Sequence, residues 1–149
     1  MQQYNISKSS SFYAIGLSYK KADADIRGRF SLDEKSKTTL LTQAQETGIE
    51  SLIVTSTCNR TEIYGFSQHP FQLIKLLCDN TKGTVDDFQE VAYVYKNKDA
   101  ISHLFRVGSG LDSQILGDFE IISQLKNSAV LSKKRGLLNP FMERLVNAV

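Results

Sequence analysis

The sequence has few residues that could form disulfides or bind a metal. Its 149 residues include two cysteines, Cys58 and Cys78, and two histidines, His69 and His103. No C-x-x-C or H-x-x-x-H spacing occurs, and these residues fall on separate expected elements, so we expect no metal site. The first residues show no apolar core followed by a small-residue cleavage site. We therefore expect a cytoplasmic protein with free thiols rather than a secreted one.

Long apolar runs and a strong charge imbalance are also missing. No run approaches the roughly 18–20 apolar residues of a membrane span, so we expect no membrane contact. The formal net charge is only +2. A dedicated polyanion binder usually carries a strong basic patch, so this charge does not by itself indicate nucleic acid binding, although it is compatible with a local patch. The length suits one domain with its own core.

Apolar periodicity and turn residues predict alternating strands and helices. Strands are predicted at 12–19, 49–56, 61–66 and 91–95, and helices at 31–47, 70–80, 99–108 and from 118 and 139 onward. Residues 22–30 suit either one or two helical turns or a solvated connector. Ser31 and Glu34 match a capping box at a helix start, and Gly48 matches a left-handed cap at the end of the same helix.

Several single residues have ordinary structural interpretations. Gly16, inside a predicted strand, favours the close approach of another backbone. Cys78 lies one turn after Ile74 on an apolar helix face, which favours a small core residue over a reactive thiol. The basic run Lys133, Lys134 and Arg135 suits a helix C-terminus, where cations are favourable.

Cys58 lies in a setting that is unusual for a structural cysteine. It follows the apolar strand signal at 52–54 and is surrounded by hydroxyl, amide and guanidinium groups, in the order Ser56-Thr57-Cys58-Asn59-Arg60. The thiolate is the reactive form, and a free cysteine titrates near ~8.5. A cation such as Arg60 beside it favours the thiolate, so the pattern predicts a reactive group at a strand end.

Two long blocks then resemble a known family. They are STCNRTEIYG at 56–65 and HLFRVGSGLDSQILGDFEIISQLK at 103–126. Together they resemble the catalytic domain of glutamyl-tRNA reductase, with a weaker third block at 16–30. The resemblance implies an α+β fold with an antiparallel sheet of about four strands packed with helices, two-layered and ferredoxin-like, plus the start of a long C-terminal connecting helix. It implies a catalytic domain over residues 1–138 and the connecting helix from 139–149, with the NADPH-binding and dimerisation domains absent from this chain.

The resemblance also implies roles for single residues. Cys58 matches the nucleophile that attacks the ester of glutamyl-tRNA, giving a thioester that hydride from NADPH reduces to glutamate-1-semialdehyde, the first step of tetrapyrrole synthesis. His103 matches an active-site histidine, although a histidine at the edge of an apolar face is commonly a hydrogen-bonded structural residue. Arg60 matches the arginine that recognises the glutamyl carboxylate, with a structural ion pair to Glu62 as the alternative.

Three further residues match substrate contacts, and other features depart from the family pattern. Thr57 and Asn59 would line the pocket beside Cys58, and Ser113 would contact substrate, although a plain turn or cap also explains it. Phe119 stands where some members carry a substrate-contacting glutamine, and Ser18-Tyr19-Lys20-Lys21-Ala22-Asp23 replaces the usual N-H-K-T-A-P. No G-x-G-x-x-G fingerprint follows a strand, so no residue is predicted to bind the cofactor.

The implied partners are glutamyl-tRNA, a downstream glutamate-1-semialdehyde aminomutase, and a second copy of the full-length protein in a homodimer. Phosphate contacts to tRNA are expected from scattered basic residues, such as Lys20, Lys21, Arg27, Arg29 and Lys133. Two other functions stay open: a non-catalytic tRNA-binding module with the same fold, and a different cysteine-dependent acyl transferase. The cysteine, arginine and histidine together favour the enzyme over the binding module.

Overall fold

A four-stranded antiparallel sheet runs through the centre of the computed structural model, which describes residues 10–111 and 120–149. The strands are β1 (Ser11–Ser18), β2 (Ser51–Ser56), β3 (Arg60–Ser67) and β4 (Tyr93–Lys96), in the order β2-β3-β1-β4. Helices separate β1 from β2 and β3 from β4, which gives the β-α-β-β-α-β connectivity of a ferredoxin-like fold. The predicted fold class and antiparallel sheet are confirmed.

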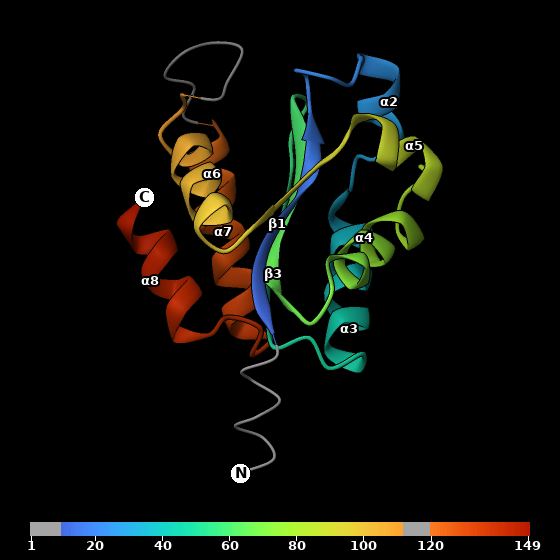
Figure 1. Cartoon of the computed structure of the whole chain (residues 1–149). Coiled ribbons are helices and arrows are strands. Elements are labelled where there is room, and N and C mark those ends of the chain that lie inside the picture. Colours follow the sequence, from blue (N-terminus) through green and yellow to red (C-terminus); the bar gives the residue numbers. More distant parts are fainter. Residues whose placement is uncertain (1–9, 112–119) are drawn as a thin grey trace.

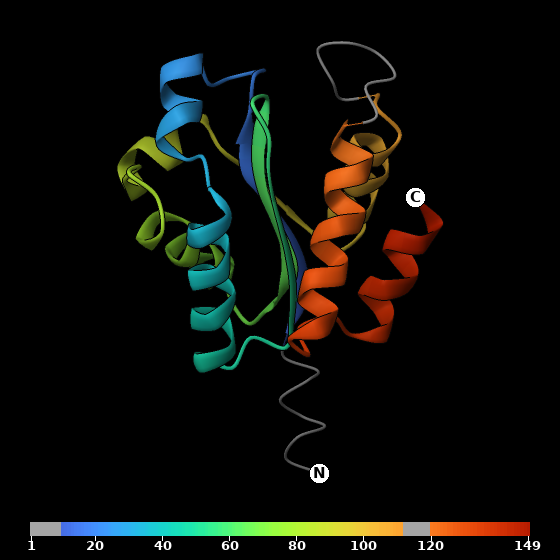
Figure 2. The same ribbon diagram turned by 180° about the vertical axis from the view of Figure 1, so that it is seen from behind.

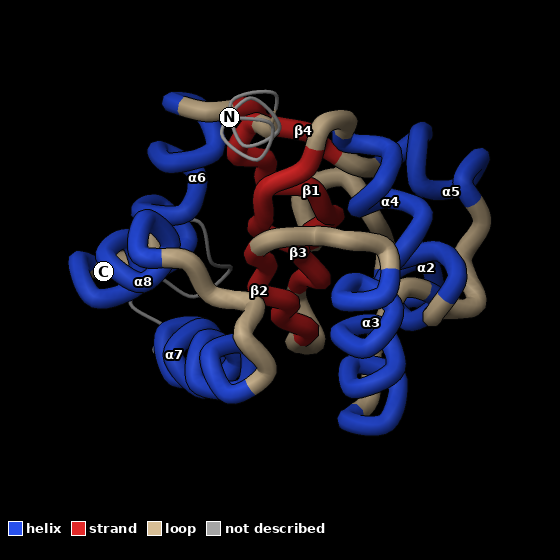
Figure 3. The backbone as a smooth tube through the Cα atoms, turned by 90° about the horizontal axis from the view of Figure 1, so that it is seen from below, coloured by secondary structure: helices blue, strands red, loops and turns tan. Residues whose placement is uncertain are grey.

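Helices cover both faces of this sheet. On one face lie α2 (Ala24–Arg29), α3 (Glu34–Glu46), α4 (Pro70–Asp79) and α5 (Val85–Val91). On the other lie α6 (Lys98–Gly108), α7 (Glu120–Lys134) and α8 (Pro140–Ala148), as Figures 1 and 2 show from opposite sides. Seen from below, the strands lie between the two groups of helices (Figure 3). The expectation of two layers was therefore incomplete, because α6–α8 add a third.

Side-chain alternation along the strands creates two separate cores. Ile15 of β1 and Ile63 of β3 point toward α3 and α4 and pack with Leu40 and Leu77. Their neighbours in the strands face the opposite way. The second core contains Phe12, Ala14, Ile53 and Tyr64 from the strands, and Leu104, Leu125, Met142 and Val146 from α6, α7 and α8. Because successive strand residues point to opposite faces, one sheet supports both helical layers.

Local capping explains most helix ends. Asp33, not Ser31, is the N-cap of α3: its carboxylate accepts from the Ser36 N–H at 2.7 Å, while the Ser31 hydroxyl donates to the Gly28 carbonyl. The predicted capping box was therefore placed two residues early. Gly48 does adopt the left-handed conformation, with φ +79, after α3 ends. The predicted helix start at Asn139 is confirmed, since its side chain accepts from the Met142 N–H at 2.9 Å.

The structure decides two further segments, residues 22–30 and 91–95. Residues 24–29 form the short helix α2, so the helical option for that segment is the one observed. The last predicted strand begins two residues later than expected, because Val91 ends α5, a helix that the sequence patterns did not indicate. Within residues 10–111 and 120–149, no helix is both long enough and apolar enough to cross a membrane. That α8 continues as a long connecting helix stays a prediction.

Candidate active site

Cys58 lies exposed in the short turn that joins β2 to β3. Thr57 holds the turn closed: its hydroxyl oxygen accepts from the backbone N–H of Asn59 at 3.2 Å and of Arg60 at 3.3 Å. Its own N–H donates to the Arg60 carbonyl at 2.8 Å, and the Asn59 carbonyl accepts from the Tyr19 N–H at 2.9 Å. These hydrogen bonds hold the backbone of residues 57–59 in place, and Cys58 is exposed to solvent.

Arg27, rather than Arg60, is the cation that the structure places at this turn. Its Nε donates to the Cys58 carbonyl at 3.0 Å, and its Nη1 donates to the Ala22 carbonyl at 2.6 Å. Arg60 is only 2% exposed, and its guanidinium pairs with Glu62. The ion pair considered as an alternative for Arg60 is therefore present.

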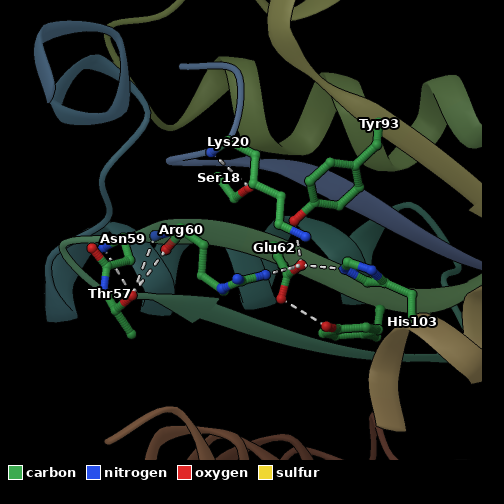
Figure 4. A network of polar contacts seen from close by, with 9 residues as sticks. Ser18, Lys20, Thr57, Asn59, Arg60, Glu62, Tyr93 and His103 are labelled. Carbon is green, nitrogen blue, oxygen red and sulfur yellow. Dashed lines mark hydrogen bonds and ion pairs between the residues drawn. The ribbon is translucent and has the colours of Figure 1, made fainter. Parts of the chain in front are cut away.

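Glu62 is the centre of a buried polar cluster on the β3 face that looks toward α6 and α7. Arg60, Glu62 and Tyr64 alternate along β3 and share this face. Glu62 Oε1 accepts from the Tyr64 hydroxyl at 2.6 Å, and Oε2 lies 3.3 Å from Arg60 Nη1 and 2.6 Å from His103 Nε2. The Tyr93 hydroxyl also donates to Oε2 (Figure 4). A carboxylate that is 1% exposed is thus surrounded by donors.

Gly16 makes room for this cluster. It pairs with Glu62 of β3 on one side and with Tyr93 of β4 on the other. A Cβ at Gly16 would lie 2.3 Å from the Thr61 carbonyl oxygen and 2.9 Å from Glu62 Cγ, closer than real Cβ atoms come. The expected close approach at Gly16 is therefore confirmed. Because Gly16 has no side chain, the Tyr93 hydroxyl can reach Glu62 across β1.

The electrostatics of the cluster favour a charged carboxylate. Burial by itself raises the pKa of Glu62, but the hydrogen bond and charge of His103, the charge of Arg60 and the Tyr64 hydroxyl outweigh it and lower the pKa from 4.5 to about 2. Burial and the Glu62 charge raise the pKa of Tyr64 well above its ordinary value, so its hydroxyl keeps the proton that it donates. Arg60 and Glu62 consequently form a buried ion pair at neutral pH.

His103 reaches the cluster from α6 and is 5% exposed. Its ring centroid lies 4.8 Å from those of Tyr93 and Tyr95 and 6.3 Å from that of Tyr64. An ionised carboxylate only accepts hydrogen bonds, so Nε2 of His103 carries the proton that faces Glu62. Nδ1 is then the ring atom left for a further partner.

The structure brings only some of the predicted site residues together. Thr57, Cys58 and Asn59 share the turn, whereas Arg60 and His103 meet at Glu62. Within the described part of the chain, the Cys58 thiol makes no hydrogen bond to either of them. Ser113 and Phe119 lie outside the described residues.

The sequence interpretation missed the central role of Glu62 and the parts of Tyr64 and Tyr93. The available signal was the alternation of Arg60, Glu62 and Tyr64 in a strand opposite a glycine. Cys78, a residue of α4, is partly buried against the core that α3 and α4 cover. Burial raises the pKa of its thiol, as expected for a structural cysteine. In the ranges that the structure describes, no three histidine, cysteine or acidic residues gather in a way that could hold a metal ion.

Comparison with known proteins gives a consistent result. The sequence profile described as "Glutamyl-tRNAGlu reductase, N-terminal domain" matches residues 15–149. A curated glutamyl-tRNA reductase of Christiangramia forsetii is 72% identical over 149 residues, which is 100% of this chain and 36% of that protein. Glutamyl-tRNA reductase 2 of Flavobacterium johnsoniae is 64% identical over the same length, 34% of that protein. The chain therefore spans about a third of these curated relatives.

A solved structure shares the fold. It is the glutamyl-tRNA reductase from Methanopyrus kandleri, with a TM-score of 0.71 and 22% identity over 91% of this chain and 32% of that chain. At this identity the likeness supports the fold, whereas the profile supports the family. Because the profile covers nearly all of the sequence, the chain belongs to the family of glutamyl-tRNA reductase N-terminal domains.

Proposed function

We propose that this chain is the part of a glutamyl-tRNA reductase that accepts the glutamyl group. The Cys58 thiolate attacks the carbonyl carbon of the ester between glutamate and tRNA. A C–S bond forms, the C–O bond breaks, and the tRNA hydroxyl leaves with a proton. The observation that carries this proposal is an exposed cysteine on a tightly held turn, directly before a strand that leads into a buried charged cluster.

Exposure of Cys58 suits a macromolecular substrate, because the ester of a tRNA must approach the thiol from solvent. The turn is held by backbone hydrogen bonds to Thr57 and from Tyr19 to Asn59, so the nucleophile needs little ordering before it reacts. Thr57 and Asn59 are proposed to contact the glutamyl group from the same turn, and Ser113 is proposed as a further contact.

Arg60 is proposed to select the substrate by binding its side-chain carboxylate. A guanidinium presents five N–H donors in a rigid fork, and the contact of Nη1 with Glu62 sets the direction of that fork. Because Arg60 is almost fully buried, a substrate carboxylate reaches it only after neighbouring side chains move. His103 is proposed to exchange a proton with the reacting groups through Nδ1, while Glu62 holds Nε2.

The complete reaction needs a reductant. NADPH would supply the hydride that converts the thioester to glutamate-1-semialdehyde. The residues of this chain do not fit that cofactor: β1 is followed by Tyr19–Asp23 and α2, without the glycine-rich turn of a dinucleotide site. We therefore assign no reduction step to this chain. Homodimerisation and transfer of the product to an aminomutase belong to the proposed whole protein.

Acylation of the chain tests the proposal. The chain is mixed with glutamyl-tRNA, and intact-protein and peptide mass spectrometry locate any added glutamyl group. We expect one group on Cys58, none in Cys58→Ser, and unchanged acylation in the matched variant Cys78→Ser. Acylation that persists in Cys58→Ser, or its absence from the unmodified chain, would overturn the proposal.

A second arm separates the alternatives. The same tRNA charged with a different amino acid is expected to acylate Cys58 much more slowly. Equal rates would favour a less specific cysteine-dependent acyl transferase. Binding of tRNA without any acylation would favour a non-catalytic tRNA-binding module.

A further inference from the structure

A pocket of about 220 Å³ is lined in part by His103, which also contacts Glu62. Its lining includes Lys20 and Lys21 after β1, Tyr93 and Tyr95 of β4, and His103 and Arg106 of α6. Figure 4 shows the Lys20 side chain extending toward the Tyr93 hydroxyl and Glu62. The pocket thus combines aromatic walls with a basic rim, and it includes His103.

The described residues that line this pocket carry charge of one sign. Lys20, Lys21 and Arg106 are among them, and none of the described lining residues is a carboxylate. Glu62, behind His103 and Tyr93, already faces Arg60 and His103. Lys21 and Arg106 have no ion pair with any residue that the structure describes. In a chain with a net charge of only +2, such a cluster is a local attraction for an anion.

The pocket and the Cys58 turn both adjoin the end of β1. Ser18 lines the pocket and pairs with Arg60 in the sheet, and the next residue, Tyr19, donates to the Asn59 carbonyl. Neighbouring strands are separated by about 4.8 Å. A ligand attached at Cys58 therefore needs to cross only the end of β1 to reach the pocket.

We propose that this pocket binds a phosphate group at the 3′ end of the tRNA, with Lys21 and Arg106 as the cations. This inference rests on the proposed function, because it places the remainder of the substrate next to the glutamyl group at Cys58. Three basic side chains on the described part of the rim match a polyanion better than a single substrate carboxylate. The rings of Tyr93 and Tyr95 offer the planar surfaces on which unstacked bases pack.

Binding of an uncharged RNA tests the pocket without acylation. The probe is a fluorescent single-stranded RNA ending in cytidine-cytidine-adenosine, and anisotropy gives its affinity over a range of salt concentrations. We expect Lys21→Gln/Arg106→Gln to weaken binding by roughly five- to thirtyfold, since each exposed ion pair is worth up to about 1 kcal/mol. Because the two cations would share one phosphate, their loss should also reduce the slope of log affinity against log salt by about 0.7.

The matched control is Lys35→Gln/Lys75→Gln, which removes the same charge from α3 and α4 on the opposite face of the sheet. It should keep the wild-type salt slope, and circular dichroism should show that both double variants are folded. Absence of RNA binding by the unmodified chain, or an equal loss in both double variants, would overturn the proposal.

A second arm distinguishes phosphate from the glutamyl carboxylate as the ligand. Cys58 acylation is measured with glutamyl-tRNA and with a glutamyl ester of adenosine, which has no phosphate. We expect Lys21→Gln/Arg106→Gln to slow the reaction of the tRNA about tenfold more than that of the small ester. Equal slowing would assign the pocket to the carboxylate and refute the phosphate site. If RNA binds as expected but neither ester acylates Cys58, the proposed acyl transfer fails while the phosphate pocket stands.

Discussion

Replacing Glu62 by glutamine would remove one buried negative charge while keeping nearly the same shape. Arg60, Tyr64, Tyr93 and His103 all direct donors at this carboxylate. The glutamine amide has one acceptor oxygen where the carboxylate has two. Its NH₂ group is itself a donor and would face other donors. The buried Arg60 would lose its ion pair with the Glu62 carboxylate. We therefore expect Glu62→Gln to destabilise the fold even though no apolar contact is lost.

The magnitude follows from the pKa of Glu62. Lowering this pKa from 4.5 to about 2 corresponds to about 3 kcal/mol of extra stabilisation of the charged form, because each pKa unit is worth about 1.4 kcal/mol. Breaking a buried ion pair by removing one partner costs about 3–5 kcal/mol, which is the same range. At pH 7 we expect the free energy of unfolding to fall by about 3 kcal/mol in Glu62→Gln.

The pH dependence provides an independent check of the sign. The folded pKa of Glu62 lies below the ordinary value, so its stabilising contribution is complete above about pH 4.5 and disappears as the pH falls toward 2. The difference in stability between the wild type and Glu62→Gln should therefore be constant from pH 7 to 5. It should narrow progressively below pH 4.5, because Glu62 of the unfolded wild type then binds a proton while Glu62 of the folded wild type stays charged until the pH nears 2.

Urea unfolding followed by circular dichroism measures these quantities. Glu90→Gln on α5 is the matched control, because Glu90 is exposed and its replacement should change stability by less than about 0.5 kcal/mol. The m-value should stay constant, so that a shift in the midpoint reports stability. Stability of Glu62→Gln within 0.5 kcal/mol of wild type at pH 7, or a difference that grows on acidification, would refute the ion-pair reasoning.

Two further predictions concern glycines. Gly16→Ala should lower the free energy of unfolding by about 1–3 kcal/mol and raise the pKa of Glu62, because the new Cβ would meet the Thr61 carbonyl and Glu62 Cγ. Urea unfolding at pH 7 and 3 measures both effects. Unchanged stability would contradict the packing at this site. Gly48→Ala should lower the free energy of unfolding by about 1–2 kcal/mol. The left-handed backbone is the only cause, since nothing lies within 4 Å of the added Cβ. Gly28→Ala in α2, which is equally open but has no positive φ, should instead stabilise by up to about 1 kcal/mol, and thermal unfolding of the two variants should move in opposite directions.

Local sequence signals were sufficient for most elements of the fold. Pro70 starts a helix because a proline fits the first helical turn, where its missing N–H has no partner to lose. Asn139 starts another because its side chain accepts a hydrogen bond from a backbone N–H of the first turn. Errors occurred where two local solutions compete. Both Ser31 and Asp33 can cap a helix, and the alternating residues at 91–95 conceal the end of α5. Such choices depend on neighbouring elements, so a short window of sequence does not decide them.

The sequence by itself determined the position of Cys58 in a polar turn and the presence of Arg60 and His103 in the same family pattern. It also determined Gly16 as a site of close approach. Only the tertiary structure decided that Arg60 and His103 meet at Glu62, because this depends on the pairing of β1 with β3 and β4 and on the packing of α6 across the sheet. The largest contribution that lowers the pKa of Glu62 comes from His103, which is distant in sequence, and only folding brings the two residues together.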